Sequence, residues 1–117
     1  MNRDRLIEGA KEALAALGNG YKPRPKPEFV LAGGDAHAEM VKFLKDGQEK
    51  GWFFSHDVTV ATAVAKIVTG GEGAAQITVS ERDMYARERA SFLELAKTPQ
   101  TRERITQLLR NGKSIRN

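Results

Sequence analysis

The sequence predicts an all-α protein of about five helices, arranged in a small orthogonal array or bundle, with a Pro-rich linker after the first helix. Apolar residues recur at helical spacing in five segments that begin or end at capping residues or glycines. No sustained run of alternating strands is present, which argues against a sheet protein. We therefore expect an N-terminal helix over residues 1–20, a linker over 21–34 and a helical C-terminal domain over 35–117.

The composition fits a single globular unit. Of the 117 residues, 40% are hydrophobic and 29% are charged, which is enough for one core and ordinary for a surface in water. The chain has no cysteine, so disulfides, thiolate nucleophiles and cysteine-ligated zinc are excluded. Residues 1–17 lack the apolar run of an export signal, and no apolar stretch is long enough to span a bilayer. A cytoplasmic location without a membrane partner is the expectation.

The first helix is predicted over residues 3–17, with Leu6, Leu14 and Leu17 on its apolar face. The glycine-rich turn at 18–20 should end it. Proline then alternates with other residues over 21–27, which fixes φ angles and holds each preceding residue extended. This stretch is interpreted as a stiff spacer, in preference to a docked recognition segment.

Two helices are predicted in the middle of the chain. Asp35 is a plausible N-cap for a helix that runs to about Lys50. Ser55 offers the N-cap of the next helix, which should end at Gly70–Gly71. The β-branched residues of this second segment also allow a strand, but its alanines and its cap favour the helix.

Two further helices are predicted near the C-terminus. Ser80 and Asp83 have the spacing of a capping box, and their helix should run to about Lys97. Thr98–Pro99 combines a cap with a proline at the first helical position, and the last helix should end at Asn111–Gly112. In the first of these two helices, the side chains expected to face inward are those of Met84, Phe92 and Leu95.

The motifs of common nucleotide sites are absent. Gly70–Gly73 closes a helix, whereas a dinucleotide-binding turn follows a strand and opens a helix. Gly112–Ser114 contains a Gly-Lys-Ser sequence, but no glycine-rich loop leads into it and no helix follows. We therefore expect this chain by itself to bind no cofactor.

The two histidines do not form a recognisable site. His37 and His56 are nineteen positions apart, and each lies near the start of a predicted helix, which favours surface residues close to caps over a metal site. Ser55–Asp57 contains the residue types of a catalytic triad, but consecutive side chains at a helix start point in different directions. Capping is the preferred interpretation, and neither catalytic residues nor metal ligands are assigned.

The charge distribution departs from a mixed pattern only near the C-terminus. The net charge is +4, and over most of the chain Lys and Arg alternate with Asp and Glu, so nucleic acid is not a favoured partner. From residue 102 to 117 a single acid, Glu103, accompanies five bases, which are Arg102, Arg104, Arg110, Lys113 and Arg116. A solvated tail is favoured over an anion-binding role, although these cations could meet phosphates.

The C-terminal third carries a resemblance to a known family. Residues 81–105 and 108–117 contain a charged helix, Phe-Leu, Thr-Pro-x-Thr and a closing Gly-Lys-x-x-Arg-Asn. This pattern resembles the C-terminal end of bacterial 3-hydroxyacyl-CoA dehydrogenases that carry a fused crotonase-like (enoyl-CoA hydratase) portion. The resemblance extends upstream to the N-terminal helix and so covers essentially the whole chain. Ser114–Ile115 departs from the Pro-Leu common in that tail.

The resemblance implies a role in fatty-acid β-oxidation. A chain similar to this tail would cover or assemble the acyl-CoA site and would not be catalytic alone, since none of the family's catalytic positions has a counterpart here. The parent family uses NAD and acyl-CoA substrates. In crotonases a lysine near the end lies close to the nucleotide part of CoA; Lys113 resembles it by position, which makes Lys113, with Arg116, a candidate contact for CoA phosphates. The implied partners are the rest of the parent enzyme or its homologue, and a homo-oligomer is expected.

Two other functions compete with this one. A stand-alone helical interaction module could bind an anionic partner through the basic C-terminal tail, and such binding would depend steeply on salt. A complete enzyme within 117 residues would need a perturbed acid or base in a pocket, and the sequence indicates none. The tail of a β-oxidation protein is therefore the preferred interpretation.

Overall fold

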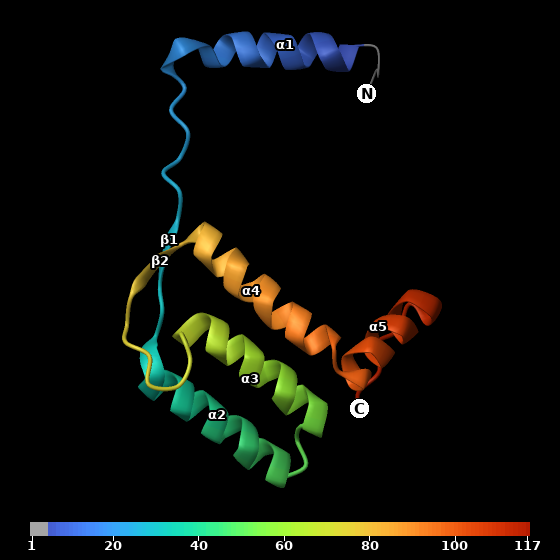
Figure 1. Ribbon diagram of the computed structural model, residues 1–117. Coiled ribbons are helices and arrows are strands. Elements are labelled where there is room, and N and C mark those ends of the chain that lie inside the picture. Colours follow the sequence, from blue (N-terminus) through green and yellow to red (C-terminus); the bar gives the residue numbers. More distant parts are fainter. Residues whose placement is uncertain (1–4) are drawn as a thin grey trace.

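A computed structural model describes residues 5–117 and confirms the all-α class (Figure 1). Residues 3 and 4 of the predicted first helix lie outside this described part. The five α-helices are α1 (Leu6–Leu17), α2 (Gly33–Glu49), α3 (Ser55–Thr69), α4 (Glu81–Ala96) and α5 (Pro99–Asn111). The short elements are the 3₁₀ turn η2 (Gly18–Gly20) and the strands β1 (Glu28–Val30) and β2 (Thr78–Ser80).

Helices α2, α3 and α4 lie side by side in one layer, and successive helices run in opposite directions (Figure 1). The axis of α5 turns away from this layer after a short connection from α4 (Figure 1). Among the residues whose burial the structure describes, the buried hydrophobic ones are few: Leu31, Ala65 and Val79. The core therefore lies between α3, β2 and the residues that follow β1, where the Ala32 amide donates to the Val68 carbonyl at 3.1 Å.

The two strands form an antiparallel pair that joins distant parts of the chain. Phe29 pairs with Val79, and the backbone pairing continues past β1, where the Leu31 amide donates to the Ile77 carbonyl at 2.9 Å. Leu31 is only 1% exposed. The segment predicted as linker, residues 21–34, thus contains β1, the most buried apolar side chain and the first residues of α2. A pairing partner so far along the chain leaves no local signal in the sequence.

Two predicted N-caps are wrong. Helix α2 begins at Gly33, before Asp35, because the Gly34 amide donates to the Ala74 carbonyl at 2.8 Å and fixes the first turn from outside the helix. Glycine is required there, since a Cβ on Gly34 would lie 2.7 Å from the Gly73 nitrogen. Helix α3 includes Ser55 as its first residue, and its N-cap is Phe54.

The predicted starts of the last two helices are confirmed. The Ser80 hydroxyl accepts a hydrogen bond from the Asp83 amide at 3.2 Å, and the Ser80 amide donates to the Asp83 carboxylate, which completes the capping box. The Thr98 hydroxyl accepts from the Thr101 amide at 3.3 Å, with Pro99 at the first helical position. These caps need only residues three positions apart, which explains why the sequence predicts them.

The expected inward direction of Phe92 is also wrong, because its side chain is 53% exposed, whereas Met84 and Leu95 are half-buried. Helix α1 is exposed along its whole described length and contains no buried residue. The extended segment 21–27 carries it away from the layer formed by α2, α3 and α4 (Figure 1). The chain is consequently elongated, with extents of 59 × 41 × 24 Å.

Candidate functional site at the C-terminal segment

The residues after α5, 113–117, form the C-terminal segment, which turns back toward the start of α5 (Figure 1). Gly112 ends the helix with a left-handed φ of 65° and permits this turn. The Arg104 Nε donates to the Asn117 side-chain oxygen at 2.7 Å, and the Asn117 amide group donates to a Glu103 carboxylate oxygen at 3.0 Å. The segment is thus held against α5 by paired polar contacts.

A single carboxylate joins the C-terminal segment to α3. Asp57, in the first turn of α3, accepts from Arg104 at 2.9 Å through one oxygen and from Arg116 at 3.0 Å through the other. The Asp57 side chain is 19% exposed, and the Arg116 guanidinium also stacks over the Phe54 ring at 5.3 Å. Asp57 is therefore shared between two cations that lie on α5 and on the C-terminal segment.

The electrostatics of Asp57 follow from these contacts. Burial by itself raises the pKa of the carboxyl, because desolvation disfavours its charged form. Hydrogen bonds from Arg104, from the Phe54 amide and from Arg116 outweigh burial and hold the pKa of Asp57 below its ordinary value. Asp57 is a carboxylate with a structural role and is poorly suited to accept a proton.

His56 is not the surface residue that the sequence predicts, since it is only 5% exposed. Its Nε2 lies 2.8 Å from the Thr101 hydroxyl on α5. Burial, and then the neighbouring Arg104 charge, lower the pKa of His56 more than the nearby Asp57 raises it. His56 and Asp57 thus contact different partners, and the consecutive Ser55, His56 and Asp57 form no catalytic relay.

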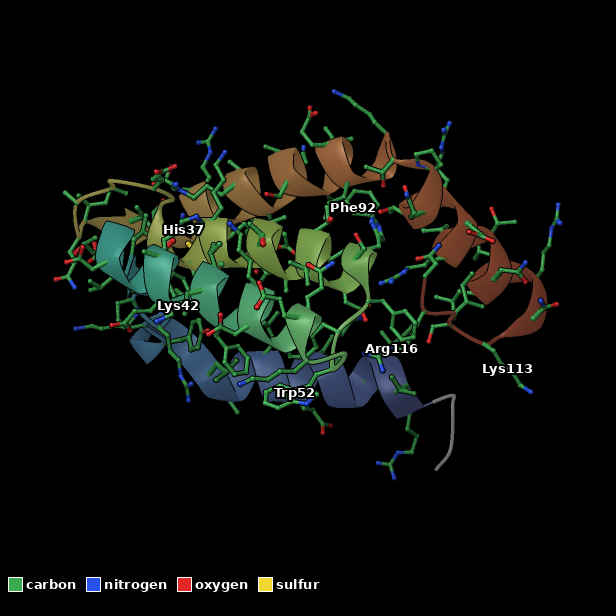
Figure 2. All side chains as sticks on the ribbon, turned by 90° about the horizontal axis from the view of Figure 1, so that it is seen from below. His37, Lys42, Trp52, Phe92, Lys113 and Arg116 are labelled. Atoms are coloured by element: carbon green, nitrogen blue, oxygen red, sulfur yellow. The ribbon has the colours of Figure 1, made fainter. Side chains whose placement is uncertain are left out.

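His37 lies far from this cluster, at the opposite end of the helical layer (Figure 2). Its Nδ1 lies 3.2 Å from the hydroxyl of the fully buried Thr69, and that hydroxyl donates to the Ala65 carbonyl at 2.7 Å. Because a hydroxyl has one proton, the His37 Nδ1 must carry the hydrogen in this contact. Within residues 5–117, no group of three or more His, Asp or Glu side chains could hold a metal ion.

The two candidate CoA contacts are not brought together. Lys113 is exposed and points outward near the end of α5, whereas Arg116 lies back against Asp57 and Phe54 (Figure 2). The Arg116 side chain remains 58% exposed. Sequence reasoning missed the anchoring roles of Asp57, Arg104 and Asn117, because Arg116 and Asp57 are 59 positions apart and no spacing rule relates them.

No helix in the part of the chain that the structure describes combines the length and apolar character needed to cross a membrane.

The fold and the anchored segment characterise a mostly helical protein, and comparison with known proteins finds one similar sequence. The chain is 27% identical over 118 aligned residues to the "Probable 3-hydroxyacyl-CoA dehydrogenase" of Bacillus subtilis (strain 168). The alignment covers 100% of this chain but only 15% of the length of that relative. This indicates a distant relationship to a 3-hydroxyacyl-CoA dehydrogenase.

This relative does not support the expected crotonase-like portion. The name of the Bacillus protein specifies a dehydrogenase and says nothing of a hydratase, so the crotonase-like portion has no support from this relative. No family model matches the chain. No solved structure matches it either.

Proposed function

We propose that this chain is the C-terminal helical part of a fatty-acid β-oxidation protein similar to 3-hydroxyacyl-CoA dehydrogenase and enoyl-CoA hydratase. In this proposal it covers or assembles the acyl-CoA site and is not catalytic alone. The observation that carries the proposal is the alignment of the whole chain with the Bacillus dehydrogenase, of which it spans 15%. NAD and acyl-CoA would be bound chiefly by the remaining parts of such a protein.

The local geometry supports an assisting role. Asp57 and His56 are the described residues of the site whose pKa values are shifted, and both are engaged by neighbours within the chain. A general base needs to reach a substrate proton, and a carboxylate held by two guanidinium groups is a weak base. The network therefore fits a device that positions the C-terminal segment better than it fits a reacting group.

Within this proposal, Lys113 is the contact for a CoA phosphate. Its exposed ammonium group projects from a segment whose end is held by the contacts of Asn117 and Arg116. Lysine serves as a point charge for phosphate, and a segment held in place loses less conformational freedom on binding. Arg116 mainly anchors the segment, and its exposed edge offers a second donor.

The proposal can be tested in a chimera of the Bacillus dehydrogenase in which this chain replaces the matching 118 residues. We expect the enzyme without that segment to lose acyl-CoA affinity, and the chimera to regain it. The isolated chain should show no dehydrogenase or hydratase turnover. Full activity and affinity without the segment would overturn the proposal.

The role of Lys113 can be tested in the same chimera. Lys113→Ala should weaken acyl-CoA binding by about tenfold, which corresponds to the loss of one charge-assisted phosphate contact. Arg110→Ala is a matched control, because it removes an exposed cation from the last turn of α5. Equal affinities of the Lys113 variant and the unchanged chimera would contradict this contact.

The alternative, a stand-alone module that binds an anionic partner through its basic tail, receives less support from the contacts. Arg104 and Arg116, two of the five basic residues of the tail, are already paired with Asp57. Steeply salt-dependent binding of a polyanion by the isolated chain, lost in Lys113→Ala, would favour this alternative.

A further inference from the structure

Helix α1 is amphipathic and, within residues 5–117, buries none of its residues against other elements. Its charged side chains, Glu8, Lys11 and Glu12, lie on one side at helical spacing, and its large apolar residues lie on the other. These apolar residues remain largely exposed: Leu6 53%, Ile7 69%, Leu14 72% and Leu17 53%. An isolated helix of 12 residues has only marginal stability in water. We therefore expect α1 to bury its apolar side against another surface.

The layer of α2, α3 and α4 contains an exposed apolar groove that could accept such a helix. Between α2 and α3 runs an almost entirely apolar groove with Ala61 and Ala65 at its small-residue positions. Two of its side chains, Phe43 and Val64, are 59% and 51% exposed, and the remaining apolar lining comes from Met40, Leu44 and Val68. Small residues between larger ones allow a helix to approach closely, as ridges pack into grooves.

The linker directs α1 away from the groove of its own chain. Pro23, Pro25 and Pro27 hold residues 21–27 extended, with a reach of about 22 Å at about 3.1 Å per residue. β1 fixes the far end of this linker to β2. Helix α1 consequently lies apart from the layer of α2, α3 and α4, in which α2 and α3 form the groove (Figure 1).

The large accessible surface of the chain supports the binding of a second molecule in the groove. The chain exposes 9596 Å², whereas a compact monomer of this size exposes about 6,300 Å². Its radius of gyration is 21.1 Å, against about 13 Å for a compact chain. A stable interface buries about 1,600 Å² in total, so the excess on one copy is more than sufficient. Reciprocal insertion of two helices also doubles the contact through two-fold symmetry.

We propose that two copies of this chain exchange α1, so that the apolar side of each α1 occupies the α2–α3 groove of the other copy. The apolar side of α1 and the α2–α3 groove, both exposed in the single chain, are then buried against each other between the two copies. The interface is independent of acyl-CoA and of the function proposed above, and it forms in the isolated chain.

Light scattering across a concentration series tests the stoichiometry. The chain should be a dimer, and Leu14→Glu should weaken its dissociation constant by about a hundredfold, because a charge would enter the apolar groove. Leu109→Glu is the matched control, since Leu109 is 80% exposed on α5, outside both surfaces. A chain that stays monomeric would overturn the exchange of α1. Equal weakening of the dimer by Leu14→Glu and Leu109→Glu would overturn it too.

Disulfide trapping tests whether the α1 in the groove comes from the same chain or from the other copy. The chain has no cysteine, so Leu14→Cys and Val64→Cys introduce single thiols on α1 and in the groove. Mixing the two single variants under oxidising conditions should give a disulfide-linked heterodimer, and Leu14→Cys mixed with Leu109→Cys should give far less. In a protein carrying both Leu14→Cys and Val64→Cys, a bond within one chain in place of a covalent dimer would overturn exchange between copies.

Discussion

Asp57 and His56 are neighbours in α3 whose protonation is coupled to folding. Both have a pKa lowered in the folded chain, so in each case the unfolded chain binds a proton more readily. The stability from His56 is present above its unfolded pKa of about 6.5 and is lost as the pH falls below it. The stability from Asp57 is lost in the same direction below about pH 4. The folded chain should therefore weaken stepwise in acid.

The His56 contribution can be isolated by His56→Gln, which retains a polar partner for Thr101 but does not titrate. We expect the fall in the free energy of unfolding between about pH 7 and pH 5 to become smaller in this variant. Urea unfolding at a series of pH values measures it. The unchanged chain, measured in parallel, is the reference, and an equally steep fall in His56→Gln would contradict this explanation.

At the scale of elements, the helix starts divide into two kinds. Helices α4 and α5 begin at side chains that bond a backbone amide three residues later, and the sequence predicts both. Helix α2 begins where the Gly34 amide meets the distant Ala74 carbonyl. A cap within one turn can be read from spacing, whereas a start set by tertiary contact cannot.

The cap of α4 gives a direct prediction. Ser80→Ala removes the acceptor for the Asp83 amide and should lower the free energy of unfolding by about 1 kcal/mol. Ser80→Thr should retain most of that stability, since threonine offers the same hydroxyl. Ser91→Ala, within α4, is the control and should change little, because alanine favours a helix. Urea unfolding compares the three, and a neutral Ser80→Ala would show that the cap is unimportant.

At the scale of the whole molecule, stability depends on a small core. Leu31, which directly follows β1, is 1% exposed, and its Cδ1 would lie 3.5 Å from a Cβ added to Gly70 at the end of α3. Because so few apolar side chains are fully buried, a cavity at this position removes a large share of the stabilising contacts. The part of the chain predicted as a linker therefore contributes to the core.

Leu31→Ala should lower the free energy of unfolding by about 2–5 kcal/mol, the usual range for truncating a buried leucine. The comparison is Leu109→Ala on the exposed surface of α5, which should change stability by no more than about 0.5 kcal/mol. Thermal unfolding followed by circular dichroism measures both at one protein concentration. A small effect of Leu31→Ala would show that the junction of sheet and helix is not the core.

Local sequence patterns predict the all-α class, the approximate extents of the five helices, the caps at Ser80 and Thr98, and the extended prolines at 23–27. Each follows from interactions within a few residues, which spacing records directly.

The burial of Leu31 and His56, and the ion pairs of Asp57 with Arg104 and Arg116, become apparent only in the folded chain. Only the folded chain shows that α1 and the α2–α3 groove are both left exposed. The reason is physical: burial and ion pairing depend on groups up to 59 positions apart, whose approach is set by packing of the whole chain and leaves no periodicity in the sequence.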